Sequence, residues 1–380
     1  MEKVRMGVVG CGGMGQGHIG MMKELTEAQL TAVSDVDAGT AKKVGEEHKV
    51  PYFNDYRKLI TSGRCDAVLI ATPHYFHHEI GIAAFKGGLH VLSEKPITVT
   101  VGGADRFLSA ARKSRKVFSV MYQQRTLPHI RLARQIVKSG RLGEIKRTLM
   151  LNPHYRSQAY YNSAGWRGTW LGEGGGALIN QAPHGIDLFM LLGGLPKRVT
   201  AKTRTRMHRI EVEDEACALL EYKNGAWGYY YTTTCEMPTT MRMEISGDCA
   251  KLVLTDNEVK LYSVKPCVSE HNKTCQSMWE APEVKEEELA VPAAESGHKE
   301  IIRNFCAAII SGEELIAPGA EGIWSVEFIN ALILSGKKNK PVDIPVDREE
   351  YESLLKRLKK GSRAKKTAKV ERVTDPRFNK

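Results

Sequence analysis

No apolar run in the 380-residue sequence reaches the length of a membrane-spanning helix. The first residues, MEKVRMGVVG, already match a buried strand, so we expect no signal peptide ahead of it. The cysteines form no Cys-x-x-Cys pair and no cluster typical of a disulfide framework. In a chain of this length, that spacing predicts reduced thiols in a cytoplasmic protein. The eight cysteines stand at positions 11, 65, 217, 235, 249, 267, 275 and 306.

Acidic residues are outnumbered, 44 Asp and Glu against 55 Lys and Arg, which gives a formal net charge of +11. The excess is concentrated at the end of the chain. Residues 356–380 hold eleven basic and two acidic side chains, a net of +9, which leaves only +2 for all other residues. A near-neutral body with a basic tail is not typical of a nucleic-acid-binding domain. We interpret the tail as a solvated segment and expect no nucleic-acid partner.

The chain is longer than one ordinary hydrophobic core requires, so we expect two domains. In the first 120 or so residues, short apolar runs alternate with helix-sized segments. This order predicts an α/β Rossmann domain with a doubly wound parallel sheet, because parallel strands need helical crossovers. The expected strands are Val4–Val9, Leu30–Ser34, Ala67–Ala71, Leu89–Ser93 and Val117–Val120.

The pattern changes from Leu149 onward, where longer alternating runs predict an open, mainly antiparallel sheet in an α+β domain. Hairpin signals stand at 223–225 and 246–248. We expect helices over 130–139, 298–311 and 320–335, a long loop over 265–297 and an edge strand near 341–345. The predicted division is 1–125, a cofactor domain; 126–355, a substrate and oligomerisation domain whose last helix and strand can pack back on the first; and 356–380, the basic tail. The strands expected in the second domain are Arg198–Met207, Ala216–Tyr222, Trp227–Thr234, Met241–Ser246 and Lys251–Thr255.

A glycine-rich motif, Gly10-Cys11-Gly12-Gly13-Met14-Gly15, fits G-x-G-x-x-G between the first strand and the first helix. In that context the motif predicts a turn that brings backbone amides close to a dinucleotide pyrophosphate. The second strand ends in Ser34-Asp35, twenty residues after the last glycine. An acid there binds ribose hydroxyls and repels a 2′-phosphate, so we expect NAD rather than NADP.

Further motifs follow in order: ATPHYFH at 71–77, SEKP at 93–96, YQQRTLP at 122–128, WR at 166–167 and GGGALINQAPHGID at 174–187. The series resembles the glucose–fructose oxidoreductase/inositol dehydrogenase (Gfo/Idh/MocA) family, from the start of the chain to about residue 355. Two positions depart from the family pattern. His74 stands where the family usually has Asn, and Asn180 where it often has Asp.

The chemistry of alcohol oxidation requires a base for the hydroxyl proton and a cation beside the developing alkoxide. The resemblance assigns these roles to His184 and Lys95. Asn180 cannot take a proton, so it positions substrate or His184. Asp187, three residues after His184, either binds substrate or orients His184. The resemblance and the polar or aromatic character of the segment together give the substrate-binding candidates Asn180, Asp187, Tyr155, Arg156, Trp166, Arg167 and His298.

The cofactor site predicted from the glycine motif, the acid and the family motifs draws on five stretches of the chain. Glu94 is expected to contact cofactor rather than act as a base. Gln123 and Arg125 either face the nicotinamide or anchor the hinge. The predicted cofactor-binding residues are Gly10, Gly12, Gly13, Met14, Gly15, Asp35, Ala71, Thr72, Pro73, His74, His77, Glu94, Lys95, Gln123 and Arg125.

The cluster His74, His77 and His78 has a spacing that could bring two imidazoles together, but no Cys or carboxylate other than Glu79 is placed beside it in sequence. We predict no metal site. Around 154–170, polar and aromatic residues suit a pyranose ring, although the same residues suit ordinary packing.

The resemblance implies an NAD-dependent sugar or cyclitol dehydrogenase that forms a homodimer or homotetramer through its open sheet. Two alternatives stay open. One is a redox-neutral, glycoside-cleaving enzyme that holds NAD tightly and passes through a keto-sugar. The other is a non-catalytic NAD-binding regulator, which an intact pair of Lys95 and His184 disfavours.

Overall fold

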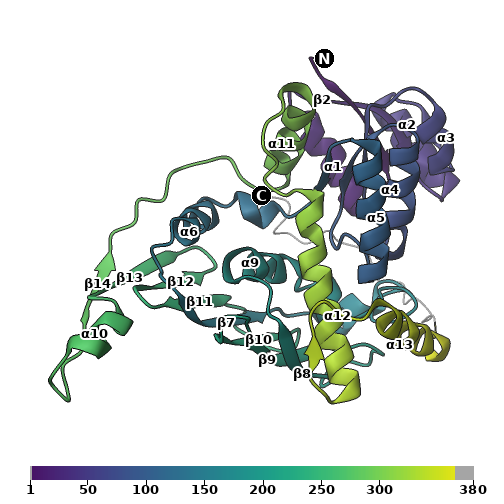
Figure 1. The fold of residues 1–380 in the computed structure, drawn as a ribbon. Coiled ribbons are helices and arrows are strands. Elements are labelled where there is room, and N and C mark those ends of the chain that lie inside the picture. The colour runs from purple at the N-terminus through teal and green to yellow at the C-terminus, as the bar shows by residue number, and fades with distance from the viewer. Residues whose placement is uncertain (1, 364–380) are drawn as a thin grey trace.

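Strand β1 (Val4–Val9) lies at the centre of a six-stranded parallel sheet in the computed structural model, which describes residues 2–363 (Figure 1). The strand order is β3-β2-β1-β4-β5-β6. The chain moves outward from β1 in one direction and then continues from β1 in the other, so a crevice opens beyond the carboxyl ends of β1 and β4, where such sheets bind ligands. The other strands are β2 (Ala28–Ser34), β3 (Tyr52–Phe53), β4 (Ala67–Ile70), β5 (His90–Ser93) and β6 (Phe118–Val120).

Helices cover both faces of this sheet, as the sequence predicts for a doubly wound fold. One of them comes from far along the chain: α11 (His298–Ser311) packs against α1 (Gly13–Met22) and β1. The first domain therefore includes a helix that the division at residue 125 assigns to the second. The remaining helices of this unit are α2 (Ala38–His48), α3 (Tyr56–Thr61), α4 (His77–Lys86) and α5 (Val101–Ser114).

A nine-stranded sheet forms the second unit, in the order β14-β13-β12-β11-β7-β10-β9-β8-β15. All neighbours are antiparallel except β7 and β10, which are parallel, so the expected mainly antiparallel sheet is confirmed. Both predicted hairpins form, since β9 pairs with β10 and β11 pairs with β12. The strands are β7 (Ile145–Pro153), β8 (Arg198–Arg204), β9 (Glu215–Glu221), β10 (Trp227–Thr233), β11 (Arg242–Gly247), β12 (Ala250–Thr255), β13 (Val259–Lys265), β14 (Glu283–Glu287) and β15 (Val342–Asp343).

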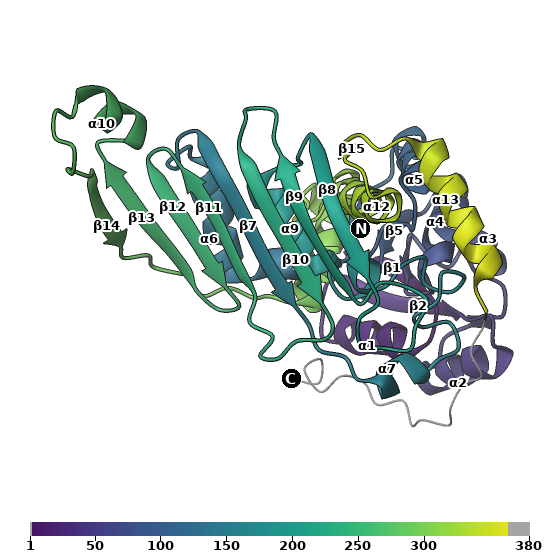
Figure 2. The same ribbon diagram turned by 90° about the horizontal axis from the view of Figure 1, so that it is seen from below.

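Helices cover only one face of the nine-stranded sheet. Helices α6 (Pro128–Lys138), α9 (Pro183–Gly193) and α12 (Gly322–Lys338) lie on the inner face, and Figure 2 shows the opposite face with no described helix in front of it. The uncovered face presents large side chains from neighbouring strands: Leu219 is 55% exposed, Trp227 60% and Tyr229 36%. A sheet face of this composition is suited to contact another protein surface.

The segment 265–297 is more ordered than the sequence predicts. It contains α10 (Val268–Thr274) and the edge strand β14, which extend the sheet at its far end. A disulfide between Cys249 and Cys267 joins the start of β12 to the start of α10. The expectation that all eight thiols are reduced is wrong for this pair, because the two cysteines, though 18 residues apart in sequence, are brought together when β13 returns alongside β12. The other six cysteines are free thiols.

The end of the described chain returns to both units. Strand β15 pairs with β8 at the edge of the large sheet, and α13 (Arg348–Gly361) packs on α5 of the small one through ion pairs of Arg348 with Asp105 and of Arg106 with Glu352. The first residues of the predicted tail, up to residue 361, continue α13, and residues 364–380 lie outside the described residues. No helix in the described part of the chain has the length and apolarity needed to cross a membrane.

A buried ion-pair network joins the two units. The Arg125 guanidinium, on the short helix η2 (Gln123–Thr126), donates through Nε and Nη2 to both carboxylate oxygens of Asp187 in α9, at 2.7 and 2.6 Å. It also donates to Glu321 of η3 (Gly319–Glu321), just before α12. Arg125 and Asp187 are 3% and 2% exposed. Burial alone would lower the pKa of Arg125. Asp187 and Glu321 raise that pKa by more than burial lowers it, so the guanidinium stays charged.

Replacing Asp187 with Ala should destabilise the fold by about 3–5 kcal/mol, because it leaves a buried arginine charge without its bidentate partner. The free energy of unfolding from urea titration measures the loss. Asp343→Ala is the matched control: it removes a carboxylate from the exposed Arg198–Asp343 pair and should cost less than about 1 kcal/mol. Equal losses in the two variants would contradict a structural role for the buried network.

Candidate functional site

The glycine motif forms the turn between β1 and α1. Gly10 has φ of +95°, and a Cβ placed there would lie 2.6 Å from the carbonyl oxygen of Ala71, so only glycine fits. At Gly12, by contrast, a Cβ would meet nothing within 4 Å, which leaves the backbone open to a ligand. Helix α1 begins at Gly13 with no side-chain cap, so its first amides are available to an anion. Gly15 packs against the Gly10 turn, and the Met14 side chain is exposed at 37%.

Asp35 lies beside this turn, at the end of β2. Its Oδ2 accepts a hydrogen bond from the Cys11 amide at 2.8 Å, and its Oδ1 accepts one from the Asp37 amide at 2.9 Å. These two bonds fix the half-buried carboxylate next to the glycine turn, with lone pairs remaining for ribose hydroxyls. The open backbone at Gly12, the uncapped helix and the oriented acid fit the dinucleotide that the sequence predicts.

The loop after β4 carries the predicted residues Ala71, Thr72, Pro73 and His74. Thr72 Oγ1 is buried and has no hydrogen-bond partner among the described residues. Because buried polar atoms are normally hydrogen-bonded, this hydroxyl is suited to bind a ligand. His77 places both ring nitrogens on backbone carbonyls, Nε2 at 2.7 Å from Thr72 O and Nδ1 at 2.8 Å from Pro96 O. His77 therefore lies between this loop and the one that follows β5, in contact with the backbone of both.

Lys95 and His184 approach one another from the two units. Lys95 follows β5, and its Nζ donates to the backbone carbonyl of Asn180 at 3.0 Å. His184 stands in the first turn of α9, with its Nε2 3.2 Å from the amide nitrogen of Gln123 on η2. The other ring nitrogen of His184, Nδ1, is buried without a partner among the described residues. The pair predicted from the sequence is thus brought together at the junction.

Burial and neighbouring charge shift the pKa values of both groups in the same direction. The pKa of Lys95 is lowered by burial and by Arg156 and Arg167, against the opposing effect of carboxylates. The pKa of His184 lies well below its ordinary value because of burial and the charge of Lys95. His184 is therefore a neutral imidazole at neutral pH, with a lone pair that can accept a proton.

Glu94 is occupied by a partner that the sequence did not reveal. Its Oε1 lies 2.7 Å from Nε2 of His18 in α1, and both side chains are buried. Burial raises the pKa of Glu94, but the hydrogen bond and charge of His18, with His298 and Lys95, lower it to about 2. The ring of His298, the first residue of α11, lies 5.5 Å from that of His18, and burial lowers the pKa of His298 to about 4. Glu94 thus holds α1 to the Lys95 loop, and His298 lies beside the same pair.

Asn180 ends the short helix α8 (Ala177–Asn180), whose start is set by Glu213. The Glu213 carboxylate accepts hydrogen bonds from the Gly176 and Leu178 amides at 2.8 and 3.2 Å. A Cβ at Gly176 would lie 1.9 Å from the Glu213 carbonyl, so the third glycine of the GGG run is required by packing. The side-chain nitrogen of Asn180 donates to the Tyr160 hydroxyl at 3.1 Å and to the Glu173 carboxylate.

The substrate-side wall comes from residues around α7 (Gln158–Asn162). The guanidiniums of Arg156 and Arg167 lie 5.2 and 4.2 Å from the centre of the Tyr160 ring, and Arg167 also donates to its hydroxyl. Trp166 lies edge-on to His74 at 6.5 Å, so it faces the cofactor loop. Tyr155 is 45% exposed at the outer end of this wall.

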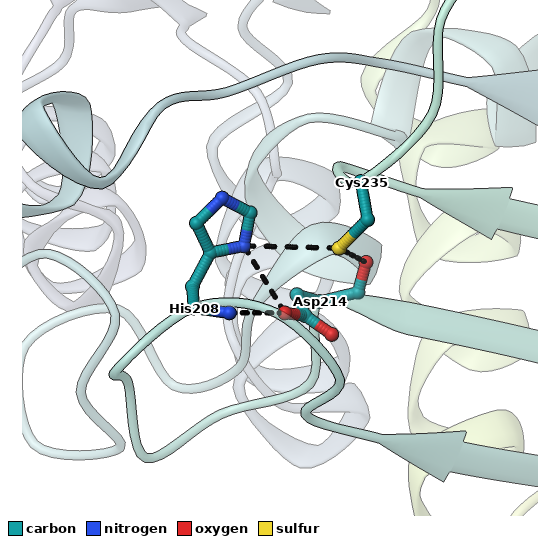
Figure 3. Close-up of side chains that lie close together, drawn as sticks. All are labelled: His208, Asp214 and Cys235. Atoms are coloured by element: carbon teal, nitrogen blue, oxygen red, sulfur yellow. Dashed lines mark hydrogen bonds and ion pairs between the residues drawn. The ribbon is translucent and has the colours of Figure 1, made fainter.

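A second polar cluster stands behind this wall (Figure 3). His208 Nδ1 lies 3.1 Å from Asp214 Oδ2 and 3.8 Å from Cys235 Sγ, and Nε2 lies 2.7 Å from the carbonyl of Arg156. The Asp214 carboxylate also accepts the backbone amides of residues 206–208. The three side chains have the spacing of metal ligands, but Asp214 already has a full set of donors. We interpret the cluster as a structural one, in which His208 holds the backbone carbonyl of Arg156 in place.

Arg125 and Asp187 are bonded to one another in the buried network described above. That contact favours the hinge-anchoring alternative for Arg125, and it occupies the Asp187 carboxylate with Arg125 rather than with His184. The groups of described residues that bring three potential metal ligands together are the His208 cluster and Asp248 with Cys249 and Cys267, whose thiols form the disulfide. The histidines at 74, 77 and 78 are not among them.

Two residues with contacts at this junction, Glu173 and His18, were not singled out from the sequence, whereas Tyr160 lies in the polar and aromatic segment 154–170 named there. Glu173 directly precedes the GGG run, and a carboxylate before a glycine run that leads to Asn180 was the available signal. His18 stands two turns into α1, where a buried polar side chain is indistinguishable in sequence from a surface one. Their importance depends on contacts between residues as far as 76 positions apart.

Comparisons with known proteins agree with this geometry. A model of an oxidoreductase family with an NAD-binding Rossmann fold matches residues 4–122, and a model of the GFO/IDH/MocA C-terminal domain matches residues 130–253. Among curated relatives, inositol 2-dehydrogenase 2 of Saccharopolyspora erythraea is 30% identical over 58% of this chain and 64% of its own length. D-glucoside 3-dehydrogenase of Escherichia coli is 25% identical over 82% of this chain and 95% of its own.

Among solved structures, the WlbA dehydrogenase of Bordetella pertussis, in complex with NADH and UDP-GlcNAcA, has a TM-score of 0.76 and 27% identity. That comparison covers 91% of this chain and the whole of the other. The sequence matches to the first curated relatives span slightly less than two thirds of those proteins, 65% and 64%.

Replacing Asp35 with Ser should weaken NAD binding about tenfold and raise the affinity for NADP, because the carboxylate that bonds the ribose and repels a 2′-phosphate is lost. Dissociation constants for both cofactors, from quenching of tryptophan fluorescence, measure the change. Asp55→Ser is the control, since Asp55 caps α3 on the same domain and serine caps equally well. An unchanged NAD/NADP ratio in Asp35→Ser would mean that the ribose is recognised elsewhere.

Proposed function

This chain belongs to the Gfo/Idh/MocA family of NAD-binding oxidoreductases, and from that premise we propose that it transfers a hydride between NAD and a secondary hydroxyl of a sugar, cyclitol or sugar derivative. The observation that carries the proposal is the convergence of Lys95 and His184 at one junction, next to the loops that fit NAD. The names of the relatives, an inositol dehydrogenase and a glucoside dehydrogenase, support a polyhydroxylated substrate.

Lys95 supplies the positive charge for the oxidation step. One of its three N–H groups bonds to the Asn180 carbonyl, so the ammonium is held in place with donors remaining for a substrate oxygen. That charge lowers the pKa of a bound hydroxyl and stabilises the alkoxide that develops as the C–H bond breaks. Bound NAD supplies the hydride acceptor for this chemistry.

His184 takes the hydroxyl proton. Its neutral ring presents one lone pair. That lone pair lies on Nδ1, the buried nitrogen without a partner among the described residues, when the Gln123 side chain turns its own unpartnered Oε1 to accept the Nε2–H. Nδ1 can then accept the substrate hydroxyl proton. The Lys95 charge that lowers the pKa of His184 also lowers that of the alcohol, so the two pKa values move together and proton transfer stays feasible. Gln123 holds the opposite side of the ring and Tyr122 stacks edge-on at 6.2 Å, which restricts its orientation.

The wall built from Arg156, Tyr160, Trp166 and Arg167 then surrounds the rest of the substrate. Guanidinium and aromatic groups suit the hydroxyls and the apolar face of a pyranose or cyclitol ring. Tyr155, beside this wall, and His298, next to His18 and Glu94, complete the proposed substrate contacts together with Asn180.

For the whole protein we propose a homodimer or homotetramer assembled through the uncovered face of the nine-stranded sheet, where Leu219, Trp227 and Tyr229 are exposed. The division into a cofactor domain and a substrate domain near residue 125, and a cytoplasmic location, are likewise proposals. The six free cysteines support that location, and the Cys249–Cys267 disulfide is the exception.

The proposed reaction is tested by following NADH absorbance when purified protein is mixed with NAD and a panel of sugars, cyclitols and glycosides. Net NADH formation with one substrate class supports the dehydrogenase. Consumption of a glycoside without net NADH, with NAD retained by the protein, would replace it by the redox-neutral cleaving enzyme. Tight NAD binding with neither outcome would indicate a regulator.

Lys95→Met and His184→Ala should each lower turnover by at least about 100-fold, because each removes a group required at the reacting hydroxyl. NAD affinity should stay close to that of the unaltered protein, since the glycine turn and Asp35 are untouched. Steady-state kinetics and NAD titration measure the two effects. Lys86→Met, at the exposed end of α4, is the control and should leave both unchanged. Full activity in either site variant would refute the assigned role.

A further inference from the structure

Glu173 places a buried carboxyl group directly against Asn180, the position where the sequence has an amide that cannot carry a proton. The Glu173 residue is 1% exposed. One carboxylate oxygen accepts the Asn180 side-chain N–H, and the other accepts the Gly168 amide at 2.6 Å. Both oxygens of the carboxylate therefore face fixed donors.

The Asn180 side chain is fully specified by these contacts. Its two N–H groups donate to Glu173 and to the Tyr160 hydroxyl, which also accepts from Arg167. The Tyr160 O–H donates to the Gln181 side chain, whose buried Oε1 has no other partner among the described residues. A carboxylate can only accept, so the nitrogen of the amide and not its oxygen must face Glu173. Asn180 Oδ1 then points away from both partners. It accepts no hydrogen bond from residues 2–363 and is not among their buried, unpartnered atoms.

We infer that Glu173 is a positioning residue of the proposed dehydrogenase site: as a carboxylate, it fixes the Asn180 amide so that Oδ1 accepts a hydrogen bond from the substrate hydroxyl. The inference rests on the proposed function for the identity of that substrate. Lys95, bonded to the backbone of the same Asn180, then delivers its charge to the neighbouring oxygen. The acceptor that the family often provides as Asp is supplied here by two residues acting together.

Protonation of Glu173 reverses the arrangement. A carboxylic acid donates through its O–H, and because the Gly168 amide is a fixed donor, the O–H end must turn toward Asn180. The amide then rotates to offer Oδ1 to Glu173, and the substrate loses its acceptor. Burial raises the pKa of Glu173 to about 7, so both forms are populated near neutral pH.

Charged groups on every side contribute to this balance. The Gly168 amide and the nearby Arg167 lower the pKa of Glu173, whereas Glu213, behind the glycine run, raises it. Lys95 faces the carboxylate from the first domain, and Tyr161 from α7. Because deprotonated Glu173 is the productive form, turnover should rise with pH through the range around 7.

The first variant is Glu173→Gln. A glutamine turns its oxygen to the Gly168 amide and its NH2 to Asn180, which reproduces the acid form at every pH. We expect kcat/KM to fall about tenfold or more, as for the loss of one hydrogen bond to substrate. The rise of kcat/KM with pH around 7, called here the pH 7 limb, should disappear. NAD affinity and the circular dichroism spectrum should match those of the unaltered protein. Retention of the limb in Glu173→Gln would overturn the inference.

The double variant Glu173→Gln with Asn180→Asp separates positioning from simple structural support. The carboxylate introduced at position 180 can accept the NH2 introduced at position 173 with one oxygen and the substrate hydroxyl with the other, so kcat/KM should recover most of the loss. Asn180→Asp alone sets two carboxyl groups against each other and should move the limb to higher pH. If the double variant is no better than Glu173→Gln alone, the two residues do not act as this pair.

An infrared titration of the protonated-carboxyl C=O band keeps the test independent of turnover. A carboxyl group should titrate near pH 7 in the unaltered protein, vanish in Glu173→Gln and shift upward in Asn180→Asp. Absence of any such group would overturn the inference whatever the enzyme does. An inactive unaltered protein that shows the expected titrations would instead reject the proposed reaction while leaving the Glu173–Asn180 coupling in place.

Discussion

The buried ion pair between Arg125 and Asp187 is the constraint on which the junction of the two units depends. Asp187 lies one turn after His184 on α9, and Arg125 lies two residues after Gln123 on η2. The same contact that joins the hinge to α9 therefore sets the distance between the His184 ring and the cofactor side. A buried charge pair tolerates little displacement, because any loss of bidentate geometry leaves a desolvated charge uncompensated. Glu321 extends the constraint to the start of α12, which lies on the inner face of the large sheet.

The wall segment between β7 and α8 is held by hydrogen bonds from side chains to its backbone rather than by an ion pair. This stretch contains only the short helix α7, so its backbone is fixed by side chains that hydrogen-bond to it. His208 bonds the Arg156 carbonyl, and Glu213 bonds the first amides of α8. Both side chains belong to or contact the Glu213–Asp214 pair that follows the wall in sequence. A long irregular segment can thus present a defined set of polar groups, because buried carboxylates replace the hydrogen bonds of regular structure.

The sequence predicted the first domain well because its signals are local. Strand β1 matches the predicted Val4–Val9, and the glycine turn and Asp35 lie where the motif places them, since a turn, a helix start and a strand end are each encoded within a few residues. The second domain has the expected sheet, but the parallel pairing of β7 with β10 joins strands about 80 residues apart and leaves no local pattern. The disulfide and the ordered 265–297 segment were missed for the same reason.

The roles of Arg125, Asp187 and Glu173 show where reasoning from motifs ends. A motif specifies that a charged side chain stands near a site. Whether that side chain is ion-paired or available to a ligand depends on a partner from another part of the chain. Asp187 stands one turn from His184 but faces Arg125, so its carboxylate is occupied by the guanidinium. Glu173, outside every quoted motif, lies against the one amide that the motif left without an acid. The hydrogen bonds available at Asn180 therefore depend on the carboxylate that contacts it. A substitution at position 180 can be interpreted only together with the residue at position 173.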